Sequence, residues 1–168
     1  EILRDKIVPH ADSEAFRERL QGRRVQSVTR RAKYLIFQLH PELVMLGHLR
    51  MTGKFVVSDP LSARAKHDRA WFWLSNGKLL IFTDMRCFGT LELFPSVAEI
   101  PKFGGLGPEP LSEEFDAKYL RSRLQKTQRE IKPLLLDQKL VAGLGNIYVS
   151  EILFAAAVHP ERRANTLS

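Results

Sequence analysis

The sequence has 168 residues, with 26 Lys and Arg against 19 Asp and Glu, a net charge of +7 and a pI near 9.8. The hydrophobic fraction of 44% indicates a folded chain rather than a disordered one. A single cysteine excludes an internal disulfide framework and a zinc site with three or four cysteine ligands. The longest apolar stretch, residues 152–158, is too short to cross a bilayer. The charge points to an anionic partner, with nucleic acid first, but leaves ribosomal, structural and enzymatic classes open.

The first half of the chain is predicted to be mainly β. A short helix is expected over 13–20, with Asp12 or Ser13 as N-cap. Short strands are then expected at 25–28, 34–39, 43–49, 55–57, 70–74, 79–83 and 90–94. The pair Asn76-Gly77 between two apolar runs is typical of a two-residue hairpin. Strands without intervening helices indicate an antiparallel sandwich or a barrel-like pair of layers.

Basic side chains are concentrated between Arg17 and Lys33, where Glu18 is the only acidic residue. A run of charge is usually a solvated face, and we keep that interpretation for the part on the short helix. The remainder is harder to explain by solubility, because like charges repel unless an anion lies nearby. This run is therefore a candidate binding surface.

The second half has a helical pattern. Residues 99–111 are rich in Pro and Gly and are predicted to be a linker. Helices are expected at 112–125, opened by Ser112, at 130–141, and from just after Asn146 to about 159. The predicted class is α+β, with an antiparallel β domain at 1–99, a linker at 100–111 and an all-α domain at 112–168.

Two glycines, Gly143 and Gly145, lie between the last two predicted helices. They permit a tight double turn, after which Asn146 is expected to cap the next helix with its N–H groups outward. Such a helix N-terminus binds phosphate without reading base sequence. An ordinary connection between two helices explains the same pattern, and the pattern alone does not choose between them.

Several motifs follow one another in the order and at the spacing of one known family. They are 30–34 (RRAKY), 48–53 (HLRMTG), 75–78 (SNGK), 83–89 (TDMRCFG), 106–111 (LGPEPL), 132–139 (KPLLLDQK), 143–148 (GLGNIY), Ser150-Glu151 and His159-Pro160. Together they span nearly the whole chain, which resembles the formamidopyrimidine-DNA glycosylases. The resemblance implies an incomplete β-sandwich followed by a helix–two-turn–helix domain. It also implies an enzyme of base-excision repair that removes oxidised purines, such as 8-oxoguanine and formamidopyrimidines, from double-stranded DNA and then cleaves the strand.

The resemblance assigns a DNA wedge to Met51, Arg86 and Phe88. An enzyme that acts on a base must flip it out of the duplex, and wedge side chains fill the space that it leaves. The alternative interpretation is that Met51 and Phe88 are core residues and that Arg86 is a solvated surface charge. If their segment is extended, Arg86 and Phe88 share one face, since they are two residues apart.

The resemblance also assigns contacts with the DNA backbone. Lys33 matches a lysine in the active-site cleft that contacts phosphate and assists catalysis, although a solvated lysine is the plainer interpretation. His48 is implied to contact phosphate, although a lone His in an apolar context is more often structural. Lys132 and Asn146 match phosphate-binding positions of the helical domain.

Three residues depart from the family pattern. Arg69 stands where a DNA-contacting His is usual, and we infer that it still binds phosphate. Cys87 replaces a basic residue, and Gln128 replaces a lysine of the lesion-recognition loop. Because each change removes or alters a phosphate contact, we expect weaker and less salt-dependent DNA binding than in the family. A buried, inert thiol is the commoner state of a lone Cys.

Parts of the family's machinery have no counterpart in residues 1–168. The family's nucleophile is an N-terminal proline followed by a glutamate, and its zinc finger lies near the other end. We therefore expect the chain to be an inactive fragment with no metal or other cofactor, cytoplasmic and close to the nucleoid, without membrane contact, and monomeric. An endonuclease VIII-type glycosylase and a non-catalytic module that binds damaged DNA remain alternatives, and a ribosomal-type basic protein is a more distant one.

Overall fold

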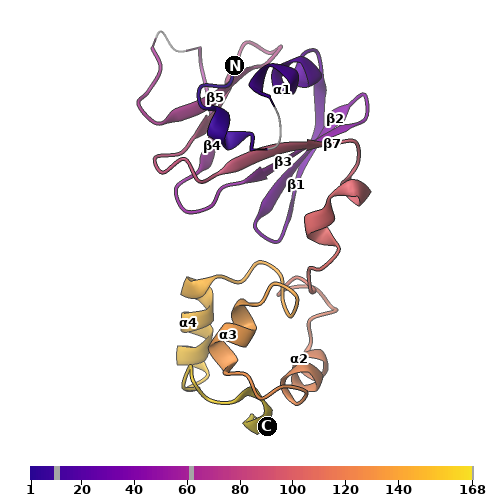
Figure 1. Ribbon diagram of the computed structural model, residues 1–168, viewed down its shortest axis with the longest axis vertical. Coiled ribbons are helices and arrows are strands. Elements are labelled where there is room, and N and C mark those ends of the chain that lie inside the picture. The colour runs from indigo at the N-terminus through magenta and orange to yellow at the C-terminus, as the bar shows by residue number, and fades with distance from the viewer. Residues whose placement is uncertain (10–11, 61–62, 168) are drawn as a thin grey trace. The chain divides into compact units, whose positions relative to one another are not determined.

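A computed structural model describes residues 1–9, 12–60 and 63–167, and the chain divides into two compact units, Glu1–Glu99 and Ile100–Ser168 (Figure 1). Ser168, the last residue of the predicted all-α domain, lies outside the described residues. Antiparallel sheets in the first unit and helices in the second confirm the predicted α+β class. Within the described part, no helix is both long and apolar enough to span a membrane.

The first unit contains two antiparallel sheets. One has the order β1-β2-β3-β7, formed by Arg24–Arg31, Tyr34–His40, Leu43–His48 and Thr90–Phe94. The other has the order β4-β6-β5, formed by Lys54–Ser58, Leu79–Thr83 and Asp68–Trp73. The predicted strands are all present, and Asn76-Gly77 lies in the turn that joins β5 to β6, as predicted. The turn is longer than the predicted two-residue hairpin, because the Leu74 N–H donates to the Lys78 carbonyl at 2.9 Å and the Gly77 N–H to the Leu74 carbonyl at 3.0 Å, with Gly77 at a φ of +80°.

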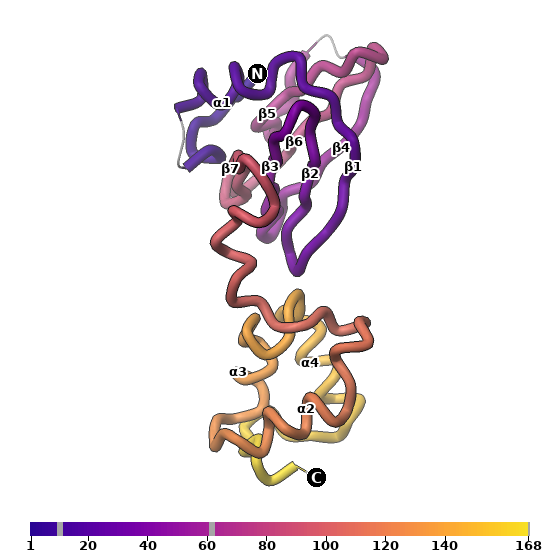
Figure 2. The backbone as a smooth tube through the Cα atoms, turned by 90° about the vertical axis from the view of Figure 1, so that its right-hand side faces the viewer, coloured from indigo at the N-terminus to yellow at the C-terminus, as the bar shows by residue number. Residues whose placement is uncertain are grey.

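The backbone traces of the two sheets lie face to face (Figure 2), and side chains from both form one apolar core. Phe37 and Met45 come from the larger sheet, and Phe82 comes from the smaller one. Helix α1 (Ser13–Leu20) adds Phe16, and the short 3₁₀ turn η1 (Asp5–Ile7) adds Ile7. These side chains are almost fully buried, so the core fixes the strands and the loops that connect them.

Strand register gathers several loops at one end of this unit. In the larger sheet, Tyr34 pairs with His48, which pairs with Thr90 on its other side. In the smaller sheet, Thr83 pairs with both Lys54 and Asp68. The turn before β2, the loop from β3 to β4 and the loop from β6 to β7 therefore all lie at ends of strands that these pairs align.

The second unit is built from helices α2 (Ala117–Leu124), α3 (Ile131–Leu136) and α4 (Asn146–Ala155), the 3₁₀ turns η3 (Pro101–Phe103) and η4 (Ala164–Thr166), and one isolated antiparallel bridge between Glu130 and Arg163. A second 3₁₀ turn of the first unit, η2 (Val97–Glu99), precedes it. The core of the second unit includes Ile131, Leu134, Val141 and Val149. This core holds α3 against α4.

The helices of the second unit are shorter than predicted. Helix α2 begins at Ala117 rather than at Ser112, because Asp116 caps it by accepting a bond of 2.6 Å from the Tyr119 N–H. Helix α3 ends at Leu136 rather than near 141, since Asp137 is extended and its carboxylate accepts the Lys139 N–H at 3.0 Å. At the start of α2 and at the end of α3, a carboxylate thus bonds a nearby backbone N–H in place of a further helical bond.

Residues 100–111, predicted to be a linker, are part of the second unit. The Gly107 N–H donates to the Gln138 carbonyl at 2.8 Å, and the Pro108 carbonyl accepts the Ala142 N–H at 2.9 Å. A Cβ at Gly107 would lie 2.5 Å from the Leu140 carbonyl oxygen. This segment therefore packs closely against the chain between α3 and α4, where Gly107 leaves no room for a side chain.

Candidate nucleic-acid interface

A buried carboxylate organises the loop between β6 and β7. Asp84 is only 1% exposed. One oxygen, Oδ1, accepts the Thr52 hydroxyl and the Arg86 N–H, the latter at 3.1 Å. The other, Oδ2, accepts the N–H groups of Phe88 and Gly89, both at 2.8 Å. Burial alone would raise the pKa of Asp84, but the Thr52 hydroxyl and the backbone N–H groups outweigh it and hold the pKa below its ordinary value.

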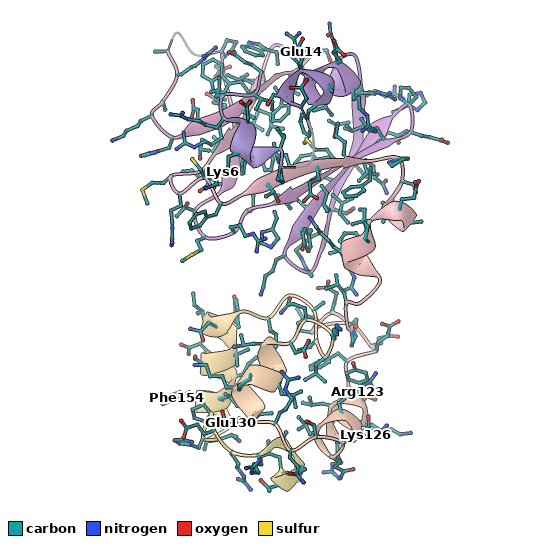
Figure 3. All side chains as sticks on the ribbon, viewed as in Figure 1. Lys6, Glu14, Arg123, Lys126, Glu130 and Phe154 are labelled. Carbon is teal, nitrogen blue, oxygen red and sulfur yellow. The ribbon has the colours of Figure 1, made fainter. Side chains whose placement is uncertain are left out.

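The three predicted wedge residues form one exposed cluster. The Arg86 guanidinium lies 4.8 Å from the centre of the Phe88 ring and donates to Met51 Sδ at 2.9 Å. Met51 is 72% exposed and Phe88 46%. The interpretation of Met51 and Phe88 as core residues is therefore wrong. The ammonium of Lys6, labelled in Figure 3, lies 5.5 Å from the centre of the same Phe88 ring.

The segment between Arg86 and Phe88 is not extended, so the condition for the two side chains to share one strand face is not met. Cys87 has a φ of +54°, in the left-handed region, and its thiol is directed to the Asp84 carbonyl at 3.8 Å. The chain turns at Cys87, and the Arg86 guanidinium lies over the Phe88 ring although the two residues do not belong to one strand. Cys87 is half-buried rather than fully buried.

Lys33 and His48 lie at the aligned strand ends. Lys33 occupies the two-residue turn between β1 and β2, after Ala32, whose φ is +51°. Lys33 is exposed, but neighbouring atoms displace enough water to lower the pKa of its ammonium. His48 accepts the Arg50 N–H on Nδ1 at 2.9 Å and packs edge-on against Tyr34, with ring centres 4.7 Å apart. A structural role for His48 is thus present, and its phosphate contact stays a prediction.

Arg69 is more enclosed than a phosphate ligand is expected to be. Its residue is 6% exposed, and its guanidinium donates to the carbonyl oxygens of Lys66 and Asp68 at 3.1 and 2.9 Å. Its Nε has no hydrogen-bond partner. Phosphate binding by Arg69 stays a prediction, and it requires this side chain to leave its present contacts.

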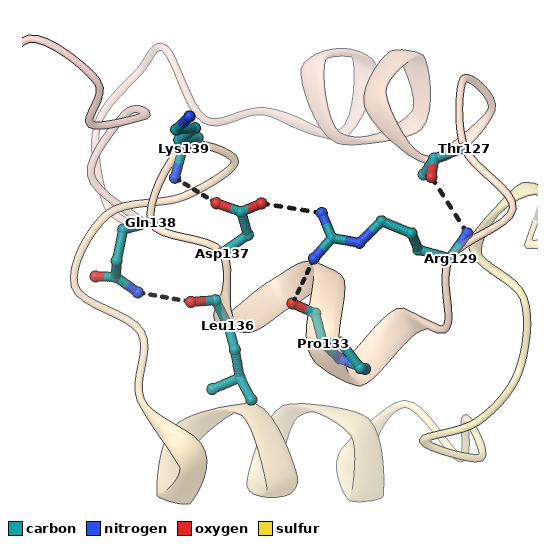
Figure 4. Close-up of polar contacts among 7 residues, drawn as sticks. All are labelled: Thr127, Arg129, Pro133, Leu136, Asp137, Gln138 and Lys139. Atoms are coloured by element: carbon teal, nitrogen blue, oxygen red, sulfur yellow. Dashed lines mark hydrogen bonds and ion pairs between the residues drawn. The ribbon is translucent and has the colours of Figure 1, made fainter.

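In the second unit, Gln138 holds the glycine turn. Its Nε2 donates to the Leu136 carbonyl at 2.9 Å (Figure 4). The same Nε2 donates to the Leu144 carbonyl at 3.0 Å, and Oε1 accepts the Gly143 N–H at 2.9 Å. Gly143 has a φ of +90°, which only glycine adopts readily. The side chain of Gln138 thereby joins the end of α3 to the turn that precedes α4.

Beside it, Asp137 pairs with Arg129 at 3.0 Å, and the Arg129 guanidinium also reaches the Pro133 carbonyl at 3.4 Å (Figure 4). The Arg129 guanidinium and the Lys139 N–H hold the pKa of the Asp137 carboxyl below its ordinary value. Gln128, the departure in the same region, is exposed, and its carbonyl accepts a bond of 2.9 Å from Arg163.

The predicted N-cap at Asn146 is wrong. Gly145 is the N-cap of α4, with φ −125° and ψ 179°, and no side chain caps the helix. Asn146 is the first helical residue and is exposed. A helix N-terminus without a side-chain cap still presents N–H groups toward an anion. Lys132, on α3, is half-buried and donates to Ser150 Oγ on α4 at 3.2 Å.

Sequence reasoning missed Asp84 and Lys6 in the first unit and Gln138 in the second. An apolar pattern gives no role to a lone polar residue, although the position of Asp84 directly after a buried strand is a usable signal. Across residues 1–9, 12–60 and 63–167, no group of three or more His, Cys, Asp or Glu side chains is placed to hold a metal ion. No metal-dependent chemistry is derived from these residues.

Fold and site together define a two-unit α+β protein, in which one unit displays a cationic–aromatic cluster on a buried carboxylate and the other a glycine turn at a helix N-terminus. The model of the formamidopyrimidine-DNA glycosylase N-terminal domain matches residues 1–91, and the model of that family's H2TH domain matches residues 106–168. The chain belongs to the formamidopyrimidine-DNA glycosylase family.

Individual relatives agree with this assignment. The formamidopyrimidine-DNA glycosylase of Bacillus subtilis is 47% identical over 161 residues, which are 94% of this chain and 58% of that protein. The enzyme of Lactococcus lactis subsp. cremoris is 43% identical over 157 residues, 92% of this chain and 57% of that protein. The chain thus spans less than two thirds of the length of these relatives.

Solved structures are similar as well. The Lactococcus lactis enzyme, non-covalently bound to DNA that contains an AP site, matches with a TM-score of 0.92 at 40% identity, over 100% of this chain and 65% of that one. Its complex with DNA that contains Fapy-dG matches with the same score and identity, over 100% of this chain and 63% of that one.

Proposed function

We propose that this chain supplies the lesion-recognition part of a base-excision repair enzyme that acts on oxidised purines in double-stranded DNA. The observation that carries the proposal is the exposed cluster of Met51, Arg86 and Phe88, joined by a guanidinium–ring contact of 4.8 Å. The Lactococcus lactis protein, 40% identical, is a formamidopyrimidine-DNA glycosylase bound to damaged DNA, which supports the same partner for this chain.

The cluster suits the physical demands of base flipping. Removal of a base from the stack leaves an apolar gap and an orphaned partner base, at a cost of a few kcal/mol. Phe88 and Met51 fill the gap with apolar atoms, and the planar Arg86 guanidinium supplies several N–H donors to the edge of the orphaned base. Lys33 is proposed to contact the phosphate beside the lesion and to assist catalysis.

The second unit is proposed to act as a helix–two-turn–helix element that holds phosphate. Support comes from the match of its H2TH model to residues 106–168, and from the uncapped N-terminus of α4 after the Gly143 turn. Asn146 and the first N–H groups of α4 would hold one phosphate, and Lys132 would add charge. These contacts fix the position of the protein on DNA and carry no base specificity.

DNA binding tests the proposal directly. We expect the chain to bind a duplex that contains a tetrahydrofuran abasic site opposite dC more tightly than the matched undamaged duplex, and both affinities to fall linearly with log salt. Phe88→Ala is expected to remove most of the preference. Trp73→Ala is the control, since Trp73 is an exposed aromatic residue of the same unit outside the cluster. Equal affinity for both duplexes would refute lesion recognition by this chain.

A second experiment tests catalysis by residues 1–168 alone. We propose that these residues bind damaged DNA without cleaving it, so borohydride treatment with an 8-oxoguanine duplex should trap no covalent adduct. An adduct that disappears in Lys33→Ala would contradict this and would identify Lys33 as a nucleophile, consistent with its lowered pKa.

We further propose a monomer that needs no cofactor for binding and acts in the cytoplasm on nucleoid DNA. The named relatives favour this branch over an endonuclease VIII-type enzyme.

A further inference from the structure

Asp84 is the most deeply buried charged side chain in the described part of the chain, at 1% exposure against 5% for Asp68 and 6% for Arg69. A buried carboxylate is costly unless hydrogen-bond donors surround it. Asp84 has them, and they come from two loops that lie far apart in the sequence: Thr52 from the loop after β3, and Arg86, Phe88 and Gly89 from the loop before β7.

Each of these two loops carries part of the wedge. Met51 directly precedes Thr52, whose hydroxyl donates to Asp84 Oδ1 and accepts the Arg86 N–H at 3.2 Å. Phe88 is fixed through its own N–H, which donates to Asp84 Oδ2 at 2.8 Å. The backbone N–H groups of Arg86 and Phe88 are therefore bonded to this carboxylate, and Met51 is linked to it through the side chain of the adjacent Thr52.

We propose that Asp84, together with Thr52, is the positioning residue that sets Met51, Arg86 and Phe88 in their DNA-binding arrangement before DNA binds. The proposal rests on the proposed function, because it assigns these three side chains to lesion recognition. Asp84 itself contacts neither the lesion nor the opposite strand. Its effect is to lower the ordering cost of the wedge, since side chains fixed in advance lose less freedom on binding.

Two features of the loop support this role. Cys87 holds a φ of +54°, a conformation unfavourable for a residue with a Cβ, and it lies between two N–H groups that both donate to Asp84. At Gly89, a Cβ would lie 3.2 Å from Asp84 Oδ2 and 2.6 Å from Phe82 Cζ. The loop therefore fits closely around the carboxylate.

The charge of Asp84 matches its role as acceptor. Its donors hold the pKa below the ordinary value despite burial, so the group is a carboxylate at neutral pH. Asp84→Asn would place an amide NH₂ opposite N–H or O–H donors on one side, replacing an attraction by a repulsion at nearly unchanged volume. This substitution consequently tests the bonds rather than the packing.

The experiment measures lesion discrimination, the ratio of affinities for the tetrahydrofuran duplex and the undamaged duplex at one salt concentration. We expect Asp84→Asn and Thr52→Val each to lower this ratio about tenfold, while affinity for undamaged DNA stays within about twofold, because phosphate contacts dominate it. Thr52→Ser should restore the ratio, since it keeps the hydroxyl. Asp68→Asn is the matched control, a buried carboxylate of the same unit whose donors are the Ala65 N–H and the Trp71 indole N–H.

Amide hydrogen exchange without DNA provides a readout that is independent of function. Asp84→Asn should accelerate exchange at Phe88 and Gly89, and Asp68→Asn should not. Unchanged discrimination in folded Asp84→Asn protein, or an equal loss in Asp68→Asn, would overturn the inference, as would failure of Thr52→Ser to restore the ratio. If the wild-type chain shows no discrimination, the proposed function fails and takes this inference with it, even where exchange shows that the bonds exist.

Discussion

Substitution of Gly89 tests how closely the loop between β6 and β7 packs against the core of the first unit and the loop after β3. A Cβ at this position would lie 2.6 Å from Cζ of Phe82, 3.1 Å from the His48 carbonyl oxygen and 3.2 Å from Asp84 Oδ2. Carbon atoms in contact normally lie about 3.5–4.0 Å apart, so the Phe82 ring would have to move by about 1 Å. That ring is fully buried and packs 5.0 Å from the Phe55 ring, which leaves it no open space.

We therefore expect Gly89→Ala to lower the free energy of unfolding of the first unit by about 2–3 kcal/mol, the upper range for overpacking a core. Both tryptophans, Trp71 and Trp73, belong to this unit, so urea unfolding followed by tryptophan fluorescence reports on it alone. Far-UV circular dichroism at 222 nm reports mainly on the second unit, which contains α2, α3 and α4 against α1 in the first, and its transition should move much less.

Gly77→Ala separates steric from conformational cost. Gly77 has a φ of +80°, but no atom lies within 4 Å of the position that a Cβ would take, so alanine there should cost only the left-handed conformation, about 1 kcal/mol. The expected order is a larger loss for Gly89→Ala than for Gly77→Ala. A loss below about 0.5 kcal/mol for Gly89→Ala, or the reverse order, would refute the close packing described above.

Further predictions concern the second unit. Gln138→Ala should lower its unfolding free energy by about 2–3 kcal/mol, measured at 222 nm in urea, because three hydrogen bonds are lost and backbone groups are left unpaired. Because the pKa of Asp137 is lowered in the folded state, its carboxylate stabilises the unit above the unfolded pKa near 3.9, and this contribution disappears as pH falls through the folded pKa. Asp137→Asn should thus cost less than about 1 kcal/mol at pH 7, since Arg129 is half exposed, and the difference from wild type should shrink as pH falls through the folded pKa. Phe154→Asp should raise solubility without changing the unfolding midpoint, because Phe154 is 86% exposed and projects outward from α4 (Figure 3); a lower midpoint would show that its ring is packed.

The strands were predictable where local pattern and tertiary packing agree. β6 has the predicted bounds, since Asn76-Gly77 fixes its start and its apolar residues face a core. β1 extends from Arg24 to Arg31, well past the apolar residues that marked it, because pairing with β2 extends the strand through polar positions. A single sequence shows the apolar pattern but not the partner strand.

The helices of the second unit were predictable in number and order but not in length. Asp116 and Asp137 each use a carboxylate to bond nearby backbone N–H groups, which starts α2 later and ends α3 earlier than apolar periodicity indicates. The same residue types also occur inside helices and on surfaces. Their role at these two positions depends on geometry that the sequence alone does not contain.

For the site, sequence reasoning identified side chains that point outward and missed those that hold them. Met51, Arg86 and Phe88 stand out through motif and residue type, whereas Asp84 and Gln138 act only through bonds to groups elsewhere in the fold. These two residues act in the same way. Each is a buried or half-buried polar side chain that forms hydrogen bonds to two chain segments beside an exposed contact surface. An exposed surface of this kind gains little from apolar packing, because its residues must stay accessible. Hydrogen bonds to a single polar side chain supply the order instead, so substitution of Asp84 should reduce lesion recognition, and substitution of Gln138 should loosen the turn before α4.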